Sequence, residues 1–230
     1  MFRSTPSPHL RASRGQGRRR FRGRNIIEFV RIPALALVLA CSAGIHAAET
    51  LRPDQLVDKV LAEVLAAIRD AQAQGKSRET ALAVAKARIL PHIDFELMTR
   101  LAMGRVWKTA SVSQRKDLVA EFGTLITRTY SFAIDAYQGQ KAIVEPLQAG
   151  PADNDVTVRT RFEKSGTQPV RVDYAMWKSP DGWKVYDIAV EHVSLVLTYR
   201  SQFNEEVQRS GIDGLLRVLT QKNRKALEDG

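Results

Sequence analysis

The side chains that could bind a metal or catalyse a reaction are few and scattered in this sequence. His92, Asp94 and Glu96 have the residue types of metal ligands, but their spacing straddles an expected helix start at Asp94. A solvated helix entrance is the simpler interpretation, and we expect neither a metal nor a cofactor. His192 beside Glu191 stands alone at an expected strand end, where a turn residue is the simpler interpretation.

Asp173 and Asp187 form a second candidate, a carboxylate pair on two expected neighbouring strands. The same polar strand face carries Arg159, Arg161 and Arg171, which makes a solvated charged surface the plainer reading of both acids. The sequence has no glycine-rich phosphate loop, no G-x-S-x-G motif and no C-x-x-C motif. The residues therefore favour a binding protein over an enzyme. A small α+β enzyme acting on a hydrophobic substrate is the alternative.

The positive charge of the chain is concentrated at its start. The 230 residues carry 35 Lys and Arg against 25 Asp and Glu, a formal net charge of +10. Residues 1–31 hold nine arginines and one acid, and residues 32–47 hold no charged residue except histidine. Residues 48–230 keep 26 bases and 24 acids, so this part does not indicate nucleic-acid binding. Nucleic-acid binding would require the arginine-rich segment to stay on the mature chain.

Residues 1–48 have the pattern of an export signal: an arginine-rich start, an uncharged apolar run and small residues before Glu49. We expect cleavage after Ala47 or Ala48 and a periplasmic protein, with the general secretory and twin-arginine routes both open. Cys41, the only cysteine, lies in this leader, and lipidation there would tether the protein. The remaining residues, 49–230, suit one domain without a disulfide or a transmembrane helix.

Helical periodicity occupies the first half of this domain. Ser77, Asp94 and Ser113 are typical N-caps, and Pro91 is expected to stop the second helix. The sequence predicts helices over residues 53–74, 77–90, 94–104 and 113–139.

After Gly139 the apolar period changes to two, which indicates strands. Two further helices are expected over residues 193–209 and 212–227, separated by Gly211. The order predicts an α+β fold: a four-stranded antiparallel meander with helices packed on one apolar face, an N-terminal helical half and two C-terminal helices. The expected strands are residues 142–147, 155–163, 170–178 and 183–190.

Two stretches of the sequence resemble a known family. Residues 185–203, VYDIAVEHVSLVLTYRSQF, are similar to the signature of the MlaC family, also called the Ttg2D or toluene-tolerance family, of periplasmic phospholipid-binding proteins. His192 and Thr198 depart from the family's usual Gly and Asn, and a left-handed conformation would cost His192 a small penalty. The resemblance runs from about Leu51 to Leu227. Further matches to the family spacing are Gly104, Trp107, Ala110, Gln114, Arg115, Phe122, Leu125, Tyr130, Tyr137, Gly139, Gly211, Ile212 and Leu215.

The resemblance implies a carrier that shuttles one phospholipid between an outer-membrane lipoprotein complex and an inner-membrane ABC transporter complex of the Mla system, which maintains outer-membrane lipid asymmetry. The acyl chains would lie in an apolar cavity between sheet and helices, and the headgroup near solvent. The alternative enzyme would use the same cavity. The residues expected to line it are Phe122, Leu125, Ile126, Val158, Phe162, Val172, Tyr174, Met176, Tyr186, Ile188, Val193, Val196 and Tyr199.

Overall fold

The structure is a computed structural model that describes residues 51–129, 137, 139–147, 150 and 152–228. The expected leader, with Cys41 and the cleavage site, lies outside the described residues. Within the described ranges, none of the helices combines the length and the apolar character that a membrane crossing needs.

The N-terminal helices begin close to the predicted residues. The Ser77 hydroxyl accepts a hydrogen bond from the Thr80 amide, and the Asp94 carboxylate caps the third helix in the same way. Ser113 was the wrong cap for the fourth helix, because Ser111 and Gln114 form a reciprocal capping box that starts the helix earlier. The predicted end of that helix, at Gly139, follows residues outside the described ranges. The elements are α1 (Pro53–Ala73), α2 (Arg78–Ile89), η1 (Leu90–His92), α3 (Phe95–Met103), η2 (Gly104–Thr109) and α4 (Val112–Thr129).

The sheet is an antiparallel meander in the order β1-β2-β3-β4-β5, as predicted except for the fifth strand and for the first, which ends at Val144 and not at residue 147. The short β5 pairs with the end of β4 after a turn at Glu191 and His192. Both turn residues have positive φ, 46° and 68°, so His192 takes the strained left-handed conformation. The Glu191 carboxylate accepts a hydrogen bond from the Arg171 amide, which helps to hold this turn. The strands are β1 (Lys141–Val144), β2 (Asp155–Glu163), β3 (Val170–Ser179), β4 (Gly182–Val190) and β5 (Val193–Ser194).

A β-bulge between β3 and β4 breaks the alternation that the sequence suggests. Val185 lies opposite Met176, and Asp187 lies opposite Ala175, so Tyr186 is an extra residue without a partner on β3. Residues before and after the bulge therefore keep their apolar side chains on one face although their sequence parity changes.

The last helix, α6 (Leu195–Glu228), is one element with a break at Gly211. Gly211 has φ 71° and ψ −178°, a conformation that only glycine adopts easily. The two predicted C-terminal helices are thus confirmed as the two segments of α6, although the first starts two residues later than expected because residues 193–194 form β5.

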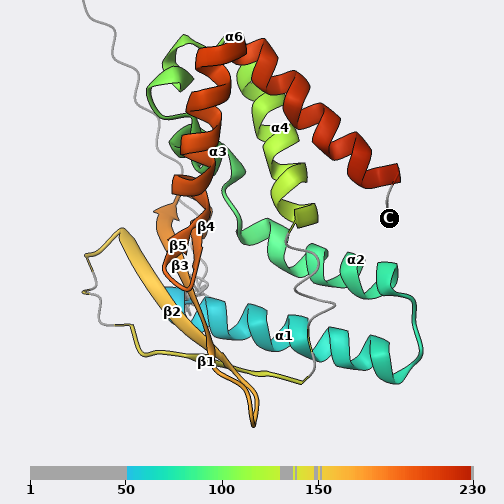
Figure 1. Ribbon diagram of the computed structural model, residues 1–230. Helices are drawn as coiled ribbons and strands as arrows, with labels where there is room; N and C mark the ends of the chain where they lie inside the picture. Colours follow the sequence, from blue (N-terminus) through green and yellow to red (C-terminus); the bar gives the residue numbers. More distant parts are fainter. Residues whose placement is uncertain (1–50, 130–136, 138, 148–149, 151, 229–230) are drawn as a thin grey trace, which may run out of the picture. The chain divides into compact units, whose positions relative to one another are not determined.

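Buried apolar side chains form three clusters. The largest, which we call the helical cluster, lies among α3, η2, α4 and α6, and Figure 1 shows α4 running beside α6. At its centre the Phe122 ring meets the rings of Tyr199 and Phe203 edge-on, with centroid distances of 4.9 and 5.0 Å. The sheet cluster joins α1 to one face of the sheet, and a third, small cluster joins α1 to α2. Helices therefore cover the sheet on its apolar face, as predicted.

Candidate functional site

The apolar face of the sheet has a closed end and an open end. At the closed end Val156, Val158, Met176 and Val185 are at most 8% exposed and belong to the sheet cluster. The open end consists of side chains that share this face by register but keep part of their surface accessible. They are Phe162, Val170, Val172 and Val190.

Four of the sheet residues expected to line a cavity divide between these two ends. Val158 and Met176 are fully buried at the closed end. Phe162 and Val172 lie at the open end, and Val172 faces Val190 across the β3–β4 ladder. The sequence interpretation did not name Val170 and Val190 among the lining residues. The alternation of the strands could have identified them, because both occupy positions of the apolar face.

Tyr174 and Ile188 lie between the two ends, opposite each other on β3 and β4. Tyr174 is hydrogen-bonded to Thr160, whose hydroxyl donates to the Val172 carbonyl at 2.8 Å. Burial raises the pKa of Tyr174 to about 12, and the bond to Thr160 partly opposes that rise. Tyr174 and Thr160 thus place a hydroxyl pair in the middle of an otherwise apolar face.

One expected lining residue lies elsewhere. The Tyr186 hydroxyl donates to Asp155 at 2.8 Å, and Asp155 alternates with the buried Val156, so the Tyr186 hydroxyl belongs to the polar side of the sheet. The bulge beside Tyr186 explains why the sequence pattern misplaced it. Val193 in β5 pairs with Val190, so it shares the apolar face at the open end, where it is 60% exposed.

The five helical residues of the expected lining all belong to the helical cluster. Phe122, Ile126 and Val196 are at most 5% exposed, so they pack as core. Leu125 and Tyr199 are partly buried and line an open pocket of about 400 Å³ between α4 and both segments of α6. Its rim carries charged side chains: Glu205, Glu206, Arg209 and Lys222.

A second pocket, of about 430 Å³, lies where the β3–β4 turn meets the start of α3. Beside it, both carboxylate oxygens of Asp94 are used: one accepts from the Leu97 amide and the other from the Trp177 indole at 2.9 Å. These two bonds give Asp94 a structural role, capping α3 and holding the indole of Trp177. Among the described residues, no group of three or more possible ligands is arranged to hold a metal ion.

The two strand carboxylates considered for catalysis have different surroundings. Asp187 accepts hydrogen bonds from the Ser194 hydroxyl and the Val196 amide, which anchors the start of α6 to β4. Asp173 lies across the β2–β3 ladder from Arg159, and one of its oxygens is buried without a hydrogen-bond partner. Because both Asp187 oxygens are engaged in structural hydrogen bonds, its geometry favours an anchoring role over catalysis.

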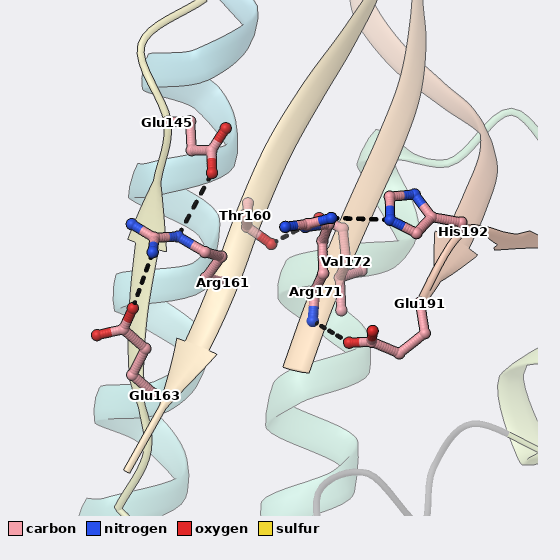
Figure 2. A network of polar contacts seen from close by, with 8 residues as sticks. All are labelled: Glu145, Thr160, Arg161, Glu163, Arg171, Val172, Glu191 and His192. Carbon is pink, nitrogen blue, oxygen red and sulfur yellow. Dashed lines mark hydrogen bonds and ion pairs between the residues drawn. The ribbon is translucent and has the colours of Figure 1, made fainter. Parts of the chain in front are cut away.

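The polar face of the sheet has its own compensation of charge (Figure 2). Arg161 lies between Glu145 and Glu163, with ion pairs of 3.4 and 3.3 Å. The Arg171 guanidinium contacts the His192 ring at 2.8 Å. Arg161 and Arg171 are directly opposite on β2 and β3, so the two glutamates offset a like-charge contact. The charge of Arg161 is therefore compensated within the sheet.

Comparison with known proteins gives this arrangement a context. A phospholipid-binding protein of Ralstonia solanacearum, solved in complex with a phospholipid, is 33% identical and superimposes with a TM-score of 0.70, covering 77% of this chain and 99% of that one. The intermembrane phospholipid transport system binding protein MlaC of Haemophilus influenzae is 26% identical over 137 residues, 58% of this chain and 64% of the relative's length.

A third relative, toluene tolerance protein ttg2D of Pseudomonas putida, is 25% identical over 82% of this chain and 87% of its own length. The family model for the MlaC protein matches residues 58–221, which include the whole sheet and most of the helices. This chain therefore belongs to the MlaC family.

Proposed function

We propose that this protein is a periplasmic carrier that holds one phospholipid by its acyl chains and shuttles it between an outer-membrane lipoprotein complex and an inner-membrane ABC transporter complex. The observation that carries the proposal is the solved Ralstonia solanacearum relative, which has the same fold at 33% identity and holds a phospholipid. Export through the N-terminal leader is part of the same proposal.

The acyl chains would lie against the open end of the apolar sheet face. Phe162, Val172 and Val190 provide apolar surface there that neighbouring helices leave partly accessible. Tyr174 and Thr160 mark the inner limit of this surface, because the closed end beyond them is filled by the sheet cluster. The headgroup would remain near solvent, at the rim of the open end.

Hydrophobic transfer energies explain why a carrier is needed. Two acyl chains hold on the order of 30 methylenes, and at ~0.8 kcal/mol each their exposure to water would cost roughly 24 kcal/mol. Moving the same chains from a bilayer into an apolar cavity is close to neutral by this measure. Loading and unloading therefore need a change of surroundings and no bond chemistry, so any use of ATP belongs to the transporter.

The direct test is lipid extraction and native mass spectrometry of the purified protein. We expect co-purifying phospholipid in the wild type and its loss in Val172→Trp, where the new ring fills the open end. Thr157→Trp is the matched control, because Thr157 is an exposed residue of the polar face, and it should keep the lipid. Absence of phospholipid from the wild type, under conditions in which the Ralstonia relative retains it, would overturn the proposal.

A further inference from the structure

A second surface of the molecule gathers positive charge without acidic partners. Residues 97–116 contain five Lys or Arg and no Asp or Glu. The rest of residues 48–230 holds 21 bases and 24 acids, so it is slightly negative. This segment covers most of α3, all of η2 and the first turn of α4.

The fold concentrates three of these cations around η2. Arg105 and Lys108 lie on η2 itself and are exposed. Arg115 reaches back from α4, donating to the carbonyls of Trp107 at 3.1 Å and Lys108 at 3.2 Å.

A fourth cation comes from the far end of the sequence. A Cβ atom at Gly104 would lie 3.1 to 3.4 Å from the guanidinium of Arg200, so the first segment of α6 delivers this guanidinium directly onto the start of η2. The glycine at position 104, with φ 57°, leaves room for it. We call Arg105, Lys108, Arg115 and Arg200 the basic corner.

The basic corner keeps its charge, unlike Arg161, which Figure 2 shows paired with two glutamates. Across the described part of the chain, the ion pairs found involve none of its four members. Arg115 donates to neutral carbonyls, which hold the guanidinium without neutralising it. Two acids near Arg115 have other partners: Asp117, two residues after it, accepts from Ser113, and Asp213 accepts from Gln114, the residue before it.

An apolar side chain projects beside these cations. Val112, the first residue of α4, is 82% exposed, more than any other large apolar side chain recorded among the described residues. The capping box of Ser111 and Gln114 fixes the backbone on either side of it. Cations around a projecting aliphatic group are the combination that binds anionic headgroups and enters the interfacial layer of a bilayer.

We infer that the basic corner is a docking surface for anionic bilayer headgroups, with Val112 entering the interface. An acidic protein surface would also attract the four cations, but it would gain nothing from a projecting aliphatic side chain unless it offered an apolar pocket. The inference goes beyond the carriage of lipid and does not depend on it.

The test is co-sedimentation of the full protein, purified as the host cell processes it, with vesicles of phosphatidylethanolamine and phosphatidylglycerol. The double variant Arg105→Gln and Lys108→Gln removes two exposed charges that make no described side-chain hydrogen bond. Arg69→Gln with Lys76→Gln is the charge-matched control, because both residues are exposed on or beside α1. Each cation near an anionic surface strengthens binding roughly fivefold, so the test pair should lose at least about tenfold in vesicle affinity and the control pair much less.

Three further measurements complete the test. Val112→Ser should weaken binding severalfold, and pure phosphatidylcholine vesicles should bind all variants equally weakly. The test pair should keep its co-purified phospholipid, which separates failure of docking from failure of carriage. Equal vesicle affinity of the test pair and the control pair overturns the inference. So does a test pair that keeps vesicle binding and loses only an acidic protein partner.

Discussion

The helical cluster and the apolar face of the sheet are built from the same residue types but differ in how they are closed. Phe122 in the helical cluster is fully buried between two other rings, whereas Phe162 on the sheet face lies at an end that helices cover only in part. The first arrangement is a core that stabilises the fold. The second leaves apolar surface for a ligand, so equal hydrophobicity serves different purposes in the two regions.

Truncating one phenylalanine in each region should separate the two purposes most clearly. Phe122→Ala should lower the free energy of unfolding by about 4 kcal/mol, because it opens a cavity in a closed cluster. Phe162→Ala should cost only about 1 kcal/mol, because that ring is partly exposed, yet it should reduce the phospholipid retained. Urea denaturation of lipid-free protein and lipid extraction measure the two effects. Similar losses of stability in the two variants would contradict the distinction between a closed core and an open sheet face.

Removing bound lipid should affect the sheet region and spare the helical cluster. A ligand present at about a hundred times its Kd stabilises a protein by about 3 kcal/mol. Amide hydrogen exchange should therefore accelerate in β2, β3 and β4 on delipidation, with little change in α3 and α4. Faster exchange in all elements alike would contradict the separation of the two regions.

Asp187 joins the two regions, since it ties β4 to the start of α6. Asp187→Ala leaves the Ser194 hydroxyl and the Val196 amide without this acceptor and should lower the free energy of unfolding by about 2 kcal/mol. Asp173→Ala is the matched control on a neighbouring strand, and it should cost little, because one of its oxygens is already buried without a partner. Thermal denaturation measures the stability of both variants. A larger loss of stability in Asp173→Ala than in Asp187→Ala would contradict the anchoring role of Asp187.

The smallest effect concerns Tyr174 at the limit of the open end. Burial raises its pKa to about 12, so the fold favours the neutral phenol. This contribution is complete below pH 10, where the unfolded phenol is also neutral, and is lost as the pH rises from 10 towards 12. At pH 11 the loss is about 1 kcal/mol relative to pH 9. Tyr174→Phe should remove this part of the pH dependence of unfolding, and identical slopes in both proteins would refute it.

Local signals in the sequence predicted most of the fold. The strand alternation gave β2 with its observed bounds, and Ser77, Asp94 and Gly211 marked helix ends correctly because their roles depend on neighbouring backbone atoms. Ser113 failed as a cap because Ser111 offered the same chemistry two residues earlier. β5 was missed because a strand of two residues is too short to show an alternation of apolar and polar side chains.

The candidate site was harder to predict, for a physical reason. Periodicity states which side chains point to the apolar face, but the exposure of Phe162 and the burial of Val158 depend on which helix packs above each one. Tyr186 was misplaced because a bulge depends on pairing with β3, which the sequence of β4 alone does not contain. Similarly, Arg200 joined the basic corner only through the packing of α6.

The packing of α6 on α4 also bears on when the protein can fold. Gln114 is hydrogen-bonded to Asp213, and Glu121 is hydrogen-bonded to Thr220 and Asn223. These partners are 99 to 102 residues apart in the sequence. Contacts of such high sequence separation form late and slowly, because a long loop must close first. The helical cluster is therefore incomplete until the C-terminal segment is available. A chain that enters a transport channel N-terminus first cannot form its largest core until its C-terminal segment is present. The chain would therefore stay unfolded enough to pass through a narrow channel.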